Sequence, residues 1–78
     1  MNTLVYYADM KNTDTELTEF MLMGHNVVLK KDAVKIYNLN KIPMEEFKII
    51  SDRIIRYLID EAFIEKKAKI RVEIVSAA

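Results

Sequence analysis

The sequence predicts a small α+β protein in which one antiparallel sheet carries its helices on a single face. Three observations support this class. A long amphipathic segment runs over residues 43–66, an alternating run follows over 68–75, and two runs rich in β-branched residues precede both. Read from the N-terminus, the predicted elements follow the order β-α-β-β-α-β.

The predicted long helix, residues 43–66, gathers its large apolar side chains in one stripe. With about 100° per residue and Ile54 set at zero, five apolar residues fall between about −40° and +80°: Ile50, Phe47, Leu58, Met44 and Ala62. This stripe is predicted to face the core. Asn40 is the predicted N-cap, and Pro43 is tolerated in the first turn of a helix.

The strands around this helix show two patterns. The last one, residues 68–75, alternates apolar with charged residues: Ile70, Val72 and Ile74 with Lys69, Arg71 and Glu73. Such alternation is typical of a strand with one buried and one wet face, so we expect its apolar side to lie under the helices. Residues 26–30 and 33–38 are predicted to form a hairpin around Lys31 and Asp32.

The N-terminal third is predicted as a strand over residues 3–10 and a short helix over 15–23. In the helical interpretation Leu17, Phe20 and Met21 share one face, and Gly24 supplies a stop. The same residues also alternate, which supports an alternative. In it residues 15–23 form a strand hairpinned with the first, giving a ββ-ββ-α-β meander with one long helix.

The βαββαβ order resembles the ferredoxin-like fold, in which an antiparallel four-stranded sheet carries both helices on one face. The resemblance covers residues 1–78 as a single domain. It implies that the strands over 3–10 and 33–38 are central neighbours in the sheet. The resemblance concerns topology only and implies no function, because unrelated functions share this fold.

Composition narrows the classes of partner. The 78 residues are 51% hydrophobic, with twelve basic and twelve acidic side chains and no cysteine. A protein with zero net charge has no overall electrostatic attraction for nucleic acid or an anionic membrane. No apolar run reaches the ~18 residues that a membrane-spanning helix needs. We therefore expect a cytoplasmic protein without disulfides. A chain this small buries only about 60–65% of its unfolded surface, and an oligomer would relieve that shortage.

The predicted helix carries more apolar surface than one sheet needs. Ile55, Ile59 and Phe63 fall at about 100°, 140° and 180° in the frame used above, beside Lys48 and Asp52. We call these five residues the helix flank. Two interpretations stay open: the flank packs against the short first helix, or a partner protein or second copy covers it.

The face of the sheet without helices is the second candidate surface. Period-two alternation places six side chains there: Val5, Tyr7, Lys35, Tyr37, Arg71 and Glu73. RNA-recognition modules of similar topology stack bases on aromatic side chains of such a face. The third strand here, AVKIYNL, lacks their glycine-rich aromatic signature, and aromatic residues on neighbouring strands also serve simply to stabilise a sheet.

No group of residues predicts catalysis, a cofactor site or a metal site. Glu61 falls inside the apolar stripe, where a charge is costly unless the helix ends or turns it to the rim. His25, the only histidine, follows Gly24 in a predicted turn and has no cysteine or spaced carboxylate beside it. We therefore expect a protein that is not an enzyme.

Our leading hypothesis is a non-enzymatic protein–protein interaction module that acts as a homodimeric regulator or inhibitor. In size and character it is similar to accessory proteins of phages and mobile elements. One alternative is a single-stranded nucleic-acid binder that uses Tyr7 and Tyr37. A second alternative is a module that senses a small metabolite.

Overall fold

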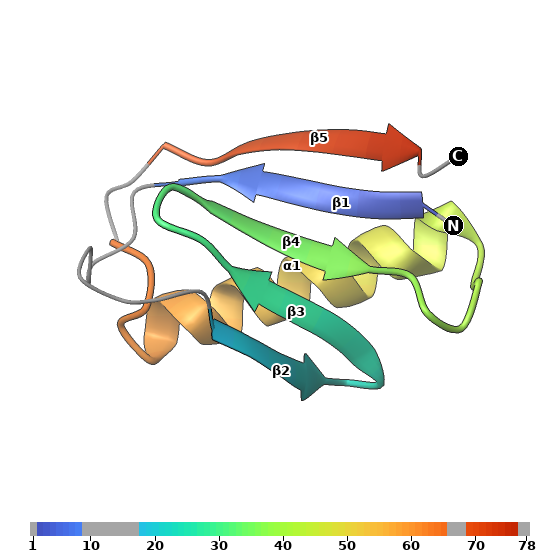
Figure 1. Ribbon diagram of the computed structural model, residues 1–78, viewed down its shortest axis with the longest axis horizontal. Coiled ribbons are helices and arrows are strands. Elements are labelled where there is room, and N and C mark those ends of the chain that lie inside the picture. Colours follow the sequence, from blue (N-terminus) through green and yellow to red (C-terminus); the bar gives the residue numbers. More distant parts are fainter. Residues whose placement is uncertain (1, 9–17, 66–68, 77–78) are drawn as a thin grey trace.

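The computed structural model describes residues 2–8, 18–65 and 69–76. It shows a small α+β fold with a five-stranded antiparallel sheet and one helix (Figure 1). The strands lie side by side in the order β2-β3-β4-β1-β5. The elements along the chain are β1 (Asn2–Tyr7), β2 (Thr18–Leu22), β3 (His25–Leu29), β4 (Ala33–Tyr37), α1 (Met44–Asp60) and β5 (Arg71–Ser76).

This arrangement differs from the predicted ferredoxin-like topology in its strand order and in having one helix among the described residues. The predicted short helix is wrong where the structure describes it, because Thr18–Leu22 forms the edge strand β2. Its side chains alternate, with Phe20 and Leu22 half-buried and Glu19 and Met21 exposed. Residues 15–17 of that prediction lie outside the described residues.

The strand interpretation of this segment is therefore confirmed over 18–22, but its pairing is not. β2 pairs with β3, whereas the alternative paired it with the first strand. The β2–β3 hairpin turns through Met23 (φ 50°) and Gly24 (φ 79°). Two successive positive φ angles define a type I′ turn, whose twist suits a two-residue hairpin. Gly24 thus closes a hairpin and not a helix.

The remaining strands follow the sequence closely. β1 pairs with β4 in antiparallel register from Thr3 opposite Tyr37 to Tyr7 opposite Ala33, as expected for central neighbours. β3 and β4 form the predicted hairpin, and the Lys30 N–H donates a hydrogen bond of 2.8 Å to the Ala33 carbonyl. Residues 9 and 10 of the predicted first strand lie outside the described residues.

Helix α1 is shorter than the predicted 43–66. Asn40 does not cap it, because the N-cap position is Pro43 and has no side-chain capping bond. At the other end Ala62 adopts a positive φ of 64°. The Ala62 N–H bonds to the Ile59 carbonyl at 3.0 Å, and the Phe63 N–H bonds to the Leu58 carbonyl at 2.8 Å. This pair of bonds is the Schellman motif, which ends helices.

One helix covers only part of the sheet. The core lies between α1 and the inward side chains of the central strands, including Leu4, Tyr6, Val34 and Ile36. In Figure 1, α1 runs diagonally behind the middle of the sheet and away from β5. A helix is about 10–12 Å across and strands are about 4.8 Å apart, so a single helix covers two or three strands.

Candidate protein-interaction surface

Strand β5 leaves its apolar side chains exposed on the helix side of the sheet. Val72 pairs with Tyr6, and Ile74 pairs with Leu4, so all four share that face. Tyr6 and Leu4 are 3% and 0% exposed, whereas Val72 and Ile74 are 40% and 57% exposed. The expectation that the apolar side of the last strand lies under the helices is therefore wrong.

We call the three residues Ile70, Val72 and Ile74 the β5 strip. Ile70 precedes the strand, keeps its alternation and is 38% exposed. The strip lies open because the segment predicted as a second helix forms β2 instead and adds a strand to the opposite edge. One edge of β5 pairs with β1. On its other edge no strand pairs with it among the described residues.

The helix flank is mostly used inside the protein. Ile55 belongs to the core with 4% exposure, and Ile59 is half-buried against it. Because Ile55 is buried in the core, this side chain is not available to a partner. Phe63 lies beyond the end of α1 and remains 44% exposed. Of the three apolar flank residues predicted to form an interface, the structure leaves only Phe63 largely exposed.

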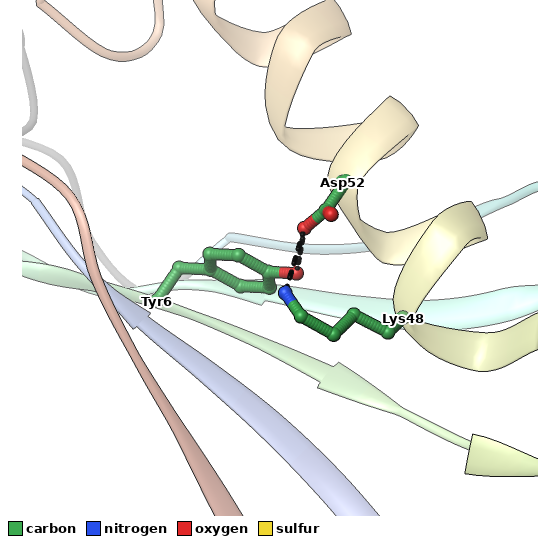
Figure 2. Close-up of polar contacts among 3 residues, drawn as sticks. All are labelled: Tyr6, Lys48 and Asp52. Atoms are coloured by element: carbon green, nitrogen blue, oxygen red, sulfur yellow. Dashed lines mark hydrogen bonds and ion pairs between the residues drawn. The ribbon is translucent and has the colours of Figure 1, made fainter. Parts of the chain in front are cut away.

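Asp52, one of the two polar members of the flank, ties α1 to the sheet (Figure 2). The Tyr6 hydroxyl donates a hydrogen bond of 2.6 Å to Asp52 Oδ1, and Lys48 Nζ lies 3.5 Å from the same oxygen. Burial first, then the hydrogen bond and the negative charge of Asp52, raise the pKa of Tyr6 well above its ordinary value. Tyr6 is on β1, so this contact directs the flank toward the β5 side of the sheet.

On the face of the sheet opposite α1, neighbouring side chains partly bury one another. Val5, predicted there as an exposed contact, is only 3% exposed, while Tyr7, Lys35 and Tyr37 are half-buried and Arg71 is exposed. The Arg71 guanidinium lies 4.4 Å from the centre of the Tyr7 ring. This is a cation–π contact, and it already occupies one face of that ring.

The two tyrosines of this face do not form one stacking platform. Tyr7 pairs with Ala33, whereas Tyr37 pairs with Thr3, four residues away along β1. Four residue steps along a strand span about 13 Å, so the two rings lie near opposite ends of the face. Basic side chains gather near the Tyr7 end, where Lys35 lowers the pKa of the neighbouring Lys30.

The structure places the other two candidate residues, His25 and Glu61, in different surroundings. His25 begins β3, is 1% exposed and meets the Phe47 ring edge-on at 5.2 Å, so it does not lie in a solvated turn. Glu61 is exposed because the helix ends at its position. Among residues 2–8, 18–65 and 69–76, no three His, Asp or Glu side chains gather as metal ligands do.

Sequence reasoning missed the exposed residues Ile49 and Ile74. Ile49 is 57% exposed on the outer side of α1, at about −140° in the helical frame, which is a signal the sequence already contains. The exposure of Ile74 has no such local signal, because it depends on how many helices cover the sheet.

No family model, curated protein or solved structure matches this chain. Within the described residues, α1 is too short and too polar to cross a bilayer.

Proposed function

We propose that this protein is a small, non-enzymatic, cytoplasmic protein-binding module that acts as a dimeric regulator or inhibitor by covering a surface of a partner protein. The observation that carries this proposal is the β5 strip, three exposed aliphatic side chains on the edge strand β5 and immediately before it. Contiguous apolar surface of this kind is typical of protein interfaces.

The energy available at the strip is enough for recognition. Complete burial of an aliphatic side chain contributes about 1.5–3 kcal/mol, and the three residues are 38–57% exposed. Completing their burial therefore contributes roughly 3 kcal/mol. This is comparable to the contribution of a strong interface residue. We expect a partner with an apolar segment, because the strip itself offers no charged side chain.

The proposal is tested by affinity capture from native host lysate with wild type, Ile74→Asp and Met21→Asp. Ile74 and Met21 are each 57% exposed on the two opposite edge strands, so Met21→Asp is a matched control. We expect one protein to be captured by wild type and Met21→Asp and lost with Ile74→Asp. The captured protein is then purified and its affinity for all three variants is measured, with circular dichroism to verify folding.

Two results would contradict the proposal. Equal capture by all three folded variants would show that the β5 strip is not the contact. Capture that disappears after nuclease treatment would show that the protein reaches its neighbours through nucleic acid.

A single-stranded nucleic-acid binder is the second candidate, supported by the basic side chains near Tyr7. Arg71 stacks on Tyr7, and Lys30 and Lys35 lie close to each other. Against it, the two tyrosines lie about 13 Å apart and the net charge is zero. A low-salt fluorescence titration decides: binding that is lost in Tyr7→Ala but kept in Tyr37→Ala would support this function.

A metabolite-sensing module has less support. A depression of about 250 Å³ is lined by four residues of α1: Ile49, Asp52, Arg53 and Arg56. Small-molecule sites are usually enclosed and span about 300–1,000 Å³. A thermal-shift screen against metabolites tests this alternative, because a ligand that binds only the native state raises its apparent stability.

A further inference from the structure

We infer that the free edge of β5 pairs with β5 of a second copy, in antiparallel register about Val72, and forms a continuous ten-stranded sheet. This inference rests on the proposed function and specifies one of its contacts. Strand addition of this kind supplies main-chain hydrogen bonds at an unpaired sheet edge. The register follows from the charges on the strand.

In antiparallel pairing about Val72, the residue numbers of two opposite positions add to 144. Arg71 of each copy then lies opposite Glu73 of the other copy, so the two-fold axis produces two ion pairs. Both residues are exposed on the face opposite α1, and neither has an ion pair within the described part of the chain. The guanidinium that stacks on Tyr7 keeps its N–H groups for this carboxylate.

The apolar residues match in the same register. Ile70 lies opposite Ile74 of the second copy, and Val72 lies opposite itself. A two-fold axis perpendicular to the sheet keeps both helices on one side, so the two β5 strips join into one strip of six aliphatic side chains. The dimer thereby enlarges the apolar surface that we propose for the partner protein. The helix-side face of this joined strip stays open to that partner.

The neighbouring registers each bring like charges together. A register centred on Arg71 pairs Glu73 with Lys69 of the other copy but places the two Arg71 side chains opposite each other, and one centred on Glu73 places the two Glu73 side chains opposite each other, which destabilises a sheet. The opposite edge strand, β2, contains one charged residue, Glu19, and the Asn26 side chain already donates a hydrogen bond of 2.7 Å to it. The β5 edge is therefore the self-complementary edge of this sheet.

Charge reversal tests the register directly. Arg71→Glu should weaken self-association roughly tenfold, because both cross-strand pairs become like-charged. Glu73→Arg should do the same. An equimolar mixture of these two variants should associate like wild type, since every acidic side chain then meets a basic one, and so should the double variant Arg71→Glu/Glu73→Arg. Sedimentation equilibrium on each sample measures these affinities.

Lys31→Glu and Glu46→Arg are matched controls that change the net charge equally at exposed positions outside β5. We expect each control to associate like wild type. A wild type that stays monomeric up to about 100 µM would overturn the inference, as would a mixture that fails to recover. The dimer fails if the wild type stays monomeric, whereas protein binding fails if the wild type captures no protein, so the two failures are separate results.

Discussion

The Tyr6 hydroxyl, which projects from strand β1, donates a hydrogen bond of 2.6 Å to the Asp52 carboxylate of helix α1. The two residues are 46 positions apart, and this contact joins the sheet to the flank of the helix (Figure 2). Tyr6 is 3% exposed while Asp52 is exposed. A phenol buried to its tip under a helix needs such a partner, because a buried hydroxyl without one is costly.

We expect Tyr6→Phe to lower the free energy of unfolding by about 1–2 kcal/mol, since hydrogen bonds to charged groups contribute about 1.5–3 kcal/mol and Asp52 is partly solvated. A double-mutant cycle that combines Tyr6→Phe with Asp52→Ala, measured by urea denaturation, should give a coupling energy of about 1 kcal/mol or more. Lys48→Ala is the control. Its ion pair with Asp52 is half-exposed, so we expect a loss below about 0.5 kcal/mol. Equal losses for Tyr6→Phe and Lys48→Ala would contradict this ranking.

The same contact predicts how stability depends on alkaline pH. Burial and Asp52 raise the pKa of Tyr6 in the folded protein, whereas in the unfolded chain it titrates near 10. Below pH ~10 both states keep the proton, and above it the unfolded state releases the proton first. The Tyr6 contribution to stability should therefore fall by up to about 1.4 kcal/mol per pH unit above pH 10.

Denaturation of wild type and Tyr6→Phe at several pH values measures this dependence. The difference between the two proteins isolates Tyr6, because the lysines and the other tyrosines titrate in both. A constant difference from pH 8 to pH 11 would contradict the assignment.

The end of helix α1 predicts a stabilising substitution. Ala62 occupies the left-handed position of a Schellman motif, with φ 64°, where a side chain costs about 1–2 kcal/mol relative to glycine. Part of this gain is offset because glycine makes the unfolded chain more flexible. We expect Ala62→Gly to raise the free energy of unfolding by about 0.5–1 kcal/mol and Tm by about 4 °C. Ala62→Val should have the opposite effect, and a stabilising Ala62→Val would contradict the mechanism.

The elements with a clear hydrophobic period were predicted from the sequence. Two chain reversals were missed, because residues that rarely adopt a positive φ occupy positions that require one. Four strands and the long helix follow from alternation and from the 3.6-residue period. Both errors at chain reversals occurred at non-glycine residues with positive φ, Met23 and Ala62. A type I′ hairpin usually has Asn, Asp or Gly before its second-position glycine, and a Schellman motif usually has glycine at the left-handed position. Met23 before Gly24, and alanine at position 62, therefore gave little signal.

The candidate surface was predictable only in part, because exposure depends on the whole fold. Local alternation correctly gave the face of each residue in β5 but could not give how much of that face the helix covers. How much of that face is covered depends on whether residues 18–22 form a helix or a strand. A second helix would have extended over the sheet, whereas with β2 as an edge strand the described residues contain one helix for five strands. The helix flank shows the same limit, since Ile55 lies about 100° from the reference residue and is still buried.

Ser51 predicts a further stabilising substitution, inside the core. It lies in the middle of α1 with 0% exposure, and its hydroxyl has no hydrogen-bond partner among the described residues. A buried unpaired hydroxyl costs about 1–3 kcal/mol, and alanine is the better helix former. We expect Ser51→Ala to raise the free energy of unfolding by about 1 kcal/mol in urea denaturation.

Ser51→Cys is the matched variant, because cysteine has a similar helix propensity to serine and replaces the hydroxyl by a less polar thiol. Stabilisation by both variants would identify the unpaired hydroxyl as the cause, whereas stabilisation by Ser51→Ala alone would assign the gain to helix propensity. A loss of stability in Ser51→Ala would show that the hydroxyl has a bonding partner in solution.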